Sequence, residues 1–267
     1  MYTIMKNIFV AILLILLGCS TGYAASPAIL YGVSGGGSTP AQYSDITFWW
    51  RCENATLDGS NDYSIGDGVA SLTGEAQIAA GGRTNNGVNL TDASNNGGDY
   101  YYIDFDVEED LADLTTTGTL YFAFKLSVRG NFASLVSLYL DASNRVFVHP
   151  INTNELRVAW YENGTNHYFE TTDVSFSLNT WYLVQVHWKV DSSDSRSLHV
   201  YNSSTGAEVG TGVTDTTDVN GFTLTTAAYM AIGTQGEVNQ EGFIDDVRLS
   251  TDETRNFVLL RDTDSYP

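Results

Sequence analysis

Apolar and polar residues alternate along many short stretches of this chain, which is the pattern of β-strands with one buried face. From about residue 46 onward, no stretch of twelve residues shows the 3.6-residue apolar period of a helix. Clusters of Gly, Asn, Asp and Ser separate these stretches, and Asn163-Gly164 is typical of a two-residue hairpin turn of type I′. The clearest predicted strands are 100–106, 119–128, 132–140, 145–149, 155–161, 181–190, 197–201, 229–233 and 243–250.

With weaker stretches added, about a dozen strands and no helices between them predict an all-β fold, an antiparallel sandwich or jelly roll. The composition agrees, because 25 Gly and 16 Tyr against four Pro favour strands and turns. The charge narrows the possible partners: 12 Lys and Arg against 32 Asp and Glu give a net charge of −20. Phosphate binding needs clustered Lys and Arg, so this balance argues against a nucleic-acid partner.

The N-terminal 24 residues have the pattern of a secretory signal peptide, with an apolar run at 8–17 that is too short to span a bilayer. Two processing routes stay open. Leu16-Leu17-Gly18-Cys19 resembles a bacterial lipobox, in which Cys19 is lipidated, while Gly22-Tyr23-Ala24 suits an ordinary signal peptidase. Either route predicts an exported protein, as a lipoprotein of the outer membrane or cell surface or as a secreted or periplasmic one. Residues 25–44 then form a flexible Gly- and Ser-containing tether, and 45–267 one domain.

Five motifs follow one another in this domain. Trp181-Tyr182-Leu183-Val184-Gln185-Val186-His187-Trp188 resembles the W-h-h-V-a-V-t-W strand of laminin-G-like domains, and 242–249 is similar to their closing G-x-I-D-E-V-R-I strand. The others are the opening strand at 46–53, Gly87-Val88-Asn89-Leu90 with 99–103, and 118–124. The resemblance implies a jelly roll of the concanavalin A-like lectin and glucanase group. It specifies no function, because this fold hosts binders, glycosidases, lyases and structural modules.

The same resemblance implies a metal site. Laminin-G-like domains often hold one calcium where the opening and closing strands meet, and the matching positions are Glu53 and Asp245. Asp58 begins an oxygen-rich loop, 58–62, that follows the opening strand. Calcium takes six to eight oxygen ligands, so we expect a structural Ca²⁺ held by these three acids, with plain surface charge as the alternative.

Aromatic residues in or beside polar loops are candidates for stacking on sugar rings. They are Trp160, Tyr161, Tyr168 and Tyr139. Trp160 is the candidate for the exposed ring, with a place in the core as the alternative, because Trp side chains are usually mostly buried. Gln185 and His187 are added as ligand-binding candidates, because alternation places them on a polar sheet face opposite Val184, Val186 and Trp188.

Two patterns keep catalysis open. Asp104, Asp106 and Glu108 alternate, and period 2 places them on one face of a strand, as a retaining glycosidase needs for carboxylates about 5–5.5 Å apart. They resemble the E-x-D-x-E strand of glucanases, with Asp at the first position. Gln185-Val186-His187 resembles the Q-[IV]-H strand of jelly-roll alginate lyases.

The sequence therefore favours an exported surface module that binds a polysaccharide or cell-surface glycan without cutting it and carries a structural calcium. The first alternative is an adhesive or structural protein–protein module. The second is a polysaccharide-degrading hydrolase or lyase that uses either the carboxylate strand or His187.

Overall fold

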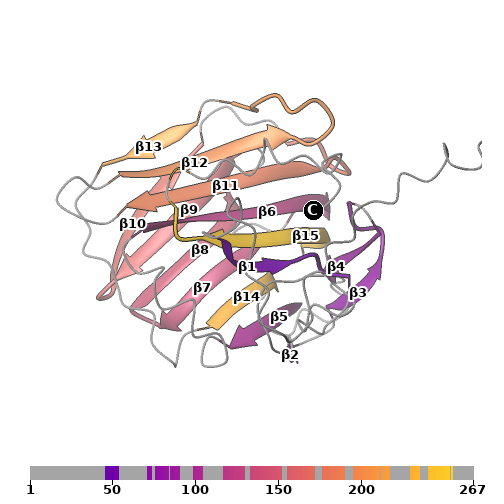
Figure 1. The fold of residues 1–267 in the computed structure, drawn as a ribbon, viewed down its shortest axis with the longest axis horizontal. Coiled ribbons are helices and arrows are strands. Elements are labelled where there is room, and N and C mark those ends of the chain that lie inside the picture. Colours follow the sequence, from indigo (N-terminus) through magenta and orange to yellow (C-terminus); the bar gives the residue numbers. More distant parts are fainter. Residues whose placement is uncertain are drawn as a thin grey trace, which may run out of the picture. The chain divides into compact units, whose positions relative to one another are not determined.

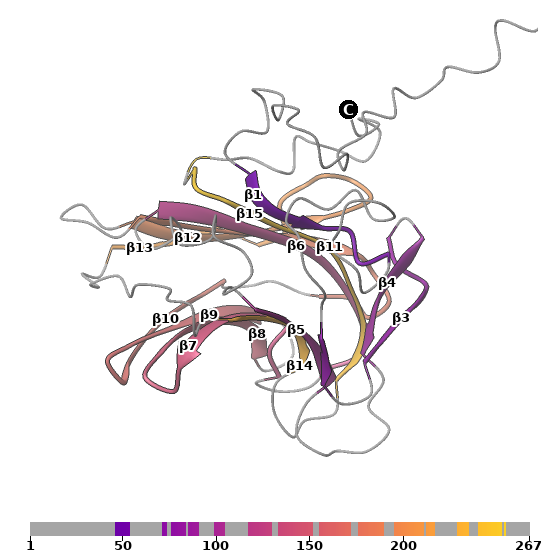
Figure 2. The ribbon, with the colours of Figure 1, turned by 60° about the horizontal axis from the view of Figure 1, so that its bottom comes forward.

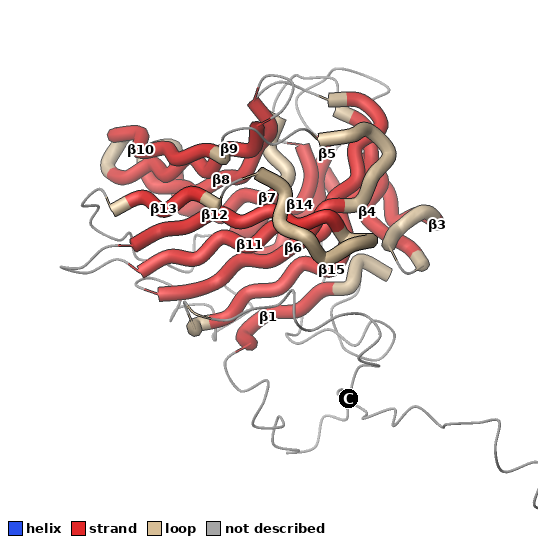
Figure 3. Tube along the Cα trace, turned by 90° about the horizontal axis from the view of Figure 1, so that it is seen from above, coloured by secondary structure: helices blue, strands red, loops and turns tan. Residues whose placement is uncertain are grey.

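The computed structural model describes residues 46–53, 71–73, 76–83, 85–90, 99–104, 117–129, 133–151, 155–171, 176–189, 195–210, 212–216, 229–234, 240–252 and 254. All of them belong to the compact unit Tyr31–Leu259. Every regular element among them is a strand (Figure 3), so the predicted all-β fold is confirmed. This part of the chain contains no helix long and apolar enough to cross a membrane. The predicted signal peptide, Cys19 and the tether lie outside the described residues.

Two antiparallel sheets form a sandwich, and they lie as two layers in Figure 2. The first sheet runs in the order β13-β12-β11-β6-β15-β4-β3, and β1 pairs with β15 (Figure 1). Its strands are β13 (Val213–Asp215), β12 (Ser195–Asn202), β11 (Tyr182–Lys189), β6 (Thr117–Val128), β15 (Glu241–Ser250), β4 (Asn86–Leu90), β3 (Gln77–Ala80) and β1 (Ile46–Trp50).

The second sheet runs in the order β10-β9-β8-β7-β14-β5-β2. Its strands are β10 (Thr165–Glu170), β9 (Glu155–Glu162), β8 (Asn144–Ile151), β7 (Val136–Asp141), β14 (Tyr229–Thr234), β5 (Asp99–Asp104) and β2 (Ser71–Thr73). Each strand predicted from the hydrophobic pattern has a counterpart in one of the two sheets.

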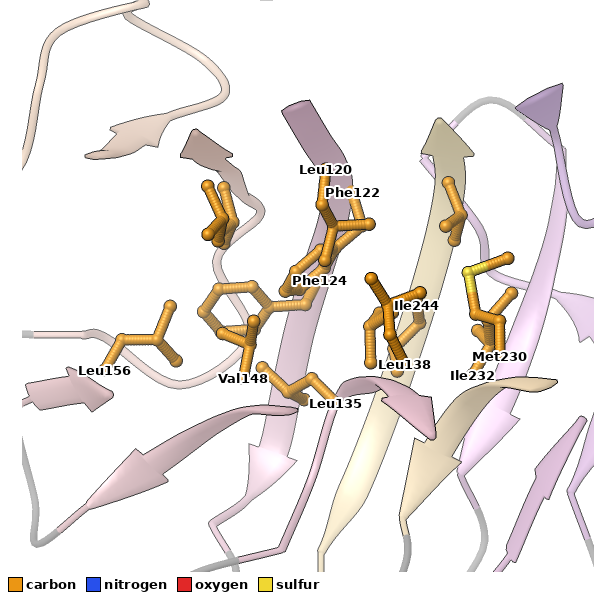
Figure 4. Packing of buried hydrophobic residues seen from close by; sticks show 14 of the residues in the cluster. Leu120, Phe122, Phe124, Leu135, Leu138, Val148, Leu156, Met230, Ile232 and Ile244 are labelled. Atoms are coloured by element: carbon orange, nitrogen blue, oxygen red, sulfur yellow. The ribbon is translucent and has the colours of Figure 1, made fainter. Parts of the chain in front are cut away.

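The core lies between the sheets, where the inward-facing residues of the central strands pack together. In β6, β11 and β15 many of the outward-facing residues are buried as well. Figure 4 shows Leu120 and Phe124 of β6 and Val148 of β8 in the space between the two sheets. Trp50 of β1 and Tyr101 of β5 also meet across the sandwich, edge to face with ring centroids 5.5 Å apart. This packing leaves the alternate residues of each strand on the outer faces of the sheets.

The hairpin between β9 and β10 has the tight turn that the sequence predicts. Asn163 and Gly164 both have positive φ, 47° and 81°, as a type I′ turn requires. Glu162 pairs directly with Thr165 across the loop. The turn thereby sets the register of β10 and determines which side chains of the two strands lie side by side.

Candidate functional site

Aromatic side chains gather on the outer face of the second sheet. Their sequence neighbours, including Leu138, Val146, Val158 and Trp160, belong to the core, so alternation directs the aromatic residues away from it. Cross-strand pairing places Tyr139, Arg145 and Tyr161 in one row and Ser137, Phe147, Ala159 and Tyr168 in the next. We call this surface the aromatic face; it comprises Tyr139, Arg145, Phe147, Arg157, Tyr161, Tyr168 and Tyr229.

The rings of the aromatic face form ordered pairs. Phe147 stacks on Tyr161 with centroids 5.6 Å apart and an interplanar angle of 20°. Tyr139 stacks on Tyr229 at 4.9 Å and 29°. Tyr168, at 55% exposure, is the most open large apolar side chain of the described residues. The face therefore combines flat apolar surface with phenolic hydroxyl groups.

Two arginines lie over these rings. The Arg157 guanidinium is 4.3 Å from the centroid of Tyr168 and forms an ion pair with Glu170, with 2.5 Å between Nη2 and Oε2. The Arg145 guanidinium is 4.5 Å from the centroid of Tyr161. Flat rings beside charged donors form a surface suited to a ligand that has both an apolar face and polar groups.

His149 is the buried titratable group beside the aromatic face. Its ring lies 5.1 Å from that of Phe147, and only 2% of the residue is exposed. Burial, and then the nearby Arg157, lower the pKa of His149 from 6.5 to about 4. The imidazole is therefore neutral at pH 7.

Because the pKa of His149 is lower in the folded state, its contribution to stability is present above pH 6.5 and is lost as the pH falls towards 4. When the pH is lowered from 7 to 4.5, the free energy of unfolding should fall in both proteins. We expect the fall to be about 2–3 kcal/mol smaller in His149→Gln than in the parent. Urea unfolding of both proteins at the two pH values measures this difference. The same pH dependence in both would show that His149 is not the group responsible.

The structure does not bring the predicted binding residues together. Tyr161, Tyr168 and Tyr139 lie on the aromatic face. Trp160 is only 3% exposed and packs in the core, 6.4 Å from the ring of Trp188, so the prediction that it is the exposed ring is wrong. Because side chains alternate along a strand, Leu156, Val158 and Trp160 share the inward face of β9. Arg145, Phe147 and Tyr229 also belong to the aromatic face, although no local pattern singles them out. The available signal is the alternation of β9 aligned with that of its neighbouring strands.

Gln185 and His187 lie on β11, in the other sheet, and do not join the aromatic face. Val184, Val186 and Trp188 point into the core, as predicted, but Gln185 is 1% exposed and so does not lie on a solvated face.

His187 takes part in a separate polar cluster. The hydroxyl of Thr119 donates to the Asp252 carbonyl at 2.7 Å, so Nδ1 of His187, 2.9 Å away, donates to Thr119. The ring of His187 meets that of His199 at 5.9 Å, and Nδ1 of His199 is 2.7 Å from Glu208 Oε1.

The predicted carboxylate strand is described only in part. Asp104 ends β5, where its backbone pairs with Tyr229 of β14. Asp106 and Glu108 lie outside the described residues, so their role remains a prediction.

The two predicted calcium ligands that the structure describes bind the same short segment. Glu53 Oε2 accepts a hydrogen bond from the Asn86 amide at 3.1 Å, and Asp245 Oδ2 accepts one from the Arg83 amide at 2.6 Å. The Asp245 carboxyl is buried, and its Oδ1 has no hydrogen-bond partner among the described residues. Burial, and then the neighbouring Asp246, raise the pKa of Asp245 to about 8. Asp58 lies outside the described residues.

The neighbouring Asp246 lies at a bulge in β15, and its carboxylate has a different environment from that of Asp245. Asp245 pairs with Ala123 and Arg248 with Tyr121, so β15 has one extra residue here, and Asp246 has a φ of 55°. The carboxylate of Asp246 accepts hydrogen bonds from the side chains of Trp49, Arg83 and Arg248 at 2.6–3.1 Å.

Burial by itself would raise the pKa of Asp246, but Arg248 and Arg83 hold it below its usual value. Asp246 is therefore an ionised structural hub with its acceptors occupied. In the described part of the chain, no three His, Cys, Asp or Glu side chains gather as a metal site.

No family model matches the sequence, and no curated protein matches it either. Solved structures do. The fold resembles domain 4 of AbnA, a GH43 extracellular arabinanase from Geobacillus stearothermophilus in complex with arabinotriose, with a TM-score of 0.55, 14% identity, and 84% of this chain and 98% of that chain covered. It also resembles the binding domain of botulinum neurotoxin DC in complex with rat synaptotagmin II, with a TM-score of 0.57, 10% identity and 82% of this chain covered.

A third similar structure is that of botulinum neurotoxin type C, with a TM-score of 0.55, 11% identity and 83% of this chain covered. Cell entry of that toxin is dependent upon interaction with two ganglioside molecules. The matches span 51% and 52% of the two neurotoxin chains. At these identities the likeness is one of fold, and the neighbours include carbohydrate-binding domains with the architecture of a β-sandwich.

Proposed function

We propose that this protein is a glycan-binding module that holds a polysaccharide or cell-surface glycan on the aromatic face without cutting it. The observation that carries the proposal is the set of stacked rings, with Tyr168 exposed, on the outer side of a sheet whose inner side is fully packed. Domain 4 of AbnA in complex with arabinotriose and the ganglioside-dependent neurotoxin support a saccharide ligand for this fold.

The physical argument rests on two properties of sugars. One side of a pyranose ring is lined by C–H groups, which pack against an aromatic face, while its hydroxyls need hydrogen-bond partners. Tyr161 and Tyr168 supply both, since each combines a ring with a hydroxyl. The rings stand on strands paired on both sides or closed by a tight turn, so little ordering is needed on binding.

The test incubates the purified protein with a panel of polysaccharides and scores both retained protein and newly released chain ends. Tyr161→Ala is expected to lose retention. Tyr201→Ala is the matched control, because Tyr201 is also half-buried but lies on β12 of the other sheet. Equal retention by both variants would rule out the aromatic face. New chain ends would indicate an enzyme instead, and no retention on any glycan would favour the adhesive module.

We also propose that the domain is laminin-G-like and exported, with Cys19 as a lipid anchor or a signal peptidase site at 22–24. The order of the five motifs supports the first statement, and the apolar run at 8–17 supports the second. Mass spectrometry of the mature N-terminus distinguishes the two routes, because only a lipidated Cys19 adds the mass of acyl chains.

A structural calcium is the remaining part of the proposal. Glu53, Asp58 and Asp245 would hold it, and the buried Oδ1 of Asp245, without a hydrogen-bond partner among the described residues, suits a hard cation. Bound calcium would neutralise the carboxylates next to Arg83 and tie the opening strand to the closing one.

EDTA is therefore expected to lower the melting temperature by about 5–10 °C relative to calcium at 100 times its Kd, since a ligand of the native state alone stabilises it. Asp245→Asn should remove this difference, whereas Glu208→Gln, which changes an acid outside this segment, should keep it. Differential scanning calorimetry measures both. Identical melting in EDTA and in calcium would contradict the proposal.

A further inference from the structure

Arg145 differs from most arginines of this protein. In the described part of the chain, five of them form ion pairs with carboxylates: Arg51, Arg83, Arg157, Arg196 and Arg248. No carboxylate of that part lies within ion-pair distance of Arg145, and its Nε is buried without a hydrogen-bond partner there. The sequence has 32 acidic residues for 12 basic ones, so a guanidinium without an anion is unusual here.

Two aromatic rings hold this guanidinium in place. Its Cζ lies 4.5 Å from the centroid of Tyr161 and 5.6 Å from that of Phe147. The strand that carries it, β8, pairs with β7 on one side and β9 on the other. The planar donor group of Arg145 is therefore ordered before any ligand binds, which lowers the entropic cost of binding.

Ser137 supplies a second polar group without a partner. It lies on β7 opposite Phe147, and Tyr139, two residues further along, lies opposite Arg145. The Oγ of Ser137 is buried and has no hydrogen-bond partner among the described residues. A carboxylate accepts hydrogen bonds from a guanidinium and from a hydroxyl, so a ligand held at Arg145 has a further donor available on the neighbouring strand β7.

We propose that the Arg145 end of the aromatic face selects a saccharide that carries a carboxylate, such as a uronic or sialic acid residue. The inference rests on the proposed glycan binding and adds the chemical class of the ligand. The carboxylate pairs with the guanidinium of Arg145, while the sugar ring lies over Tyr139 and Tyr161. The net charge of −20 repels anions in general, so the preference depends on a carboxylate placed at this one point.

The experiment compares short acidic oligosaccharides with their methyl esters, which keep the rings and remove the charge. The probes are trisaccharides of galacturonate, glucuronate and mannuronate, and sialyllactose, titrated calorimetrically at low salt. For at least one pair, the parent is expected to bind the acid about 10-fold more tightly than the ester. Arg145→Gln should bind both forms with the affinity of the ester.

Arg129→Gln is the matched control. This substitution removes one positive charge, as Arg145→Gln does. Arg129 has no ion pair among the described residues and follows β6 of the first sheet, so Arg129→Gln should keep the preference for the acid over the ester. Arg145→Lys keeps the charge but loses the planar fork, and its preference should be reduced without being abolished. Thermal melting of each variant confirms that it is folded, and Arg145→Lys carries the test if Arg145→Gln does not fold.

The outcomes separate this inference from the function on which it rests. If the parent binds acid and ester equally and Tyr161→Ala binds neither, the proposed selection for a carboxylate is overturned, while glycan binding by the aromatic face is supported. A preference that survives in Arg145→Gln overturns the role of Arg145. Tighter binding of a sulfated trisaccharide than of any acid overturns the choice of carboxylate. Absence of binding to every probe and to the polysaccharide panel contradicts the proposed function itself.

Discussion

Asp246→Asn is expected to lower the free energy of unfolding by about 3–5 kcal/mol, because it leaves buried arginines without their counter-charge. The side chains of Arg83 and Arg248 are only 8% and 3% exposed, and both pair with Asp246. Asn has nearly the same volume, so the loss reports on charge rather than on a cavity. Urea unfolding at pH 7 measures it.

Glu208→Gln is the control for an exposed pair. Its partner is His199, and the two side chains are 30% and 38% exposed, so the expected change is below about 1 kcal/mol. A change of the same small size in Asp246→Asn would show that the cluster on β15 does not depend on its central charge.

Trp160→Ala is expected to cost about 3–5 kcal/mol of unfolding free energy, since it removes a large side chain from the core. The ring packs near Trp188 from the other sheet, and Cζ of the Arg196 guanidinium lies 5.6 Å from its centroid. Tyr161→Ala, at the next position of the same strand, should cost only about 1 kcal/mol because its side chain is on the outer face.

The effect of the two variants on glycan retention should be the reverse of their effect on stability. Below its melting temperature, Trp160→Ala should retain the glycan, whereas Tyr161→Ala should lose it. Chemical unfolding and the polysaccharide panel measure the two properties independently. Full stability with lost retention in Trp160→Ala would place the indole in the binding site and contradict the assignment of β9.

Local patterns were enough to predict the central strands of this fold, whereas β2, β3, β10 and β13 were not among the stretches named from the sequence. Alternation identified strands such as β6, β9 and β11, because the backbone geometry of a strand sends successive side chains to opposite sides whatever its partners are. The turn at Asn163-Gly164 was also predictable, since two successive residues with positive φ favour these residue types.

The pairing of distant strands was a different matter. β6 lies between β11 and β15 in the first sheet, and β14 lies between β7 and β5 in the second. Periodicity contains no information about such partners. The bulge at Asp246 is a mixed case. The core residues Ile244 and Val247 are three positions apart, so the alternation slips at 245–246, but only the pairing of Asp245 and Arg248 with β6 shows that the slip is a bulge.

The candidate site illustrates the same division. Three of its tyrosines, Tyr139, Tyr161 and Tyr168, were predicted as aromatic residues beside polar loops. Arg145 and Phe147 were missed, because their importance comes from neighbours on other strands.

The sequence alone determined that this protein is built of antiparallel strands, which side chains of one strand share a face, and where the β9–β10 hairpin turns. Only the tertiary structure decided which of the two faces is buried. That choice places Trp160 in the core and Tyr161 on the aromatic face, although the residues are adjacent. The physical reason is that alternation is a local property of the extended backbone, whereas burial depends on the opposing sheet, whose residues come from distant parts of the chain.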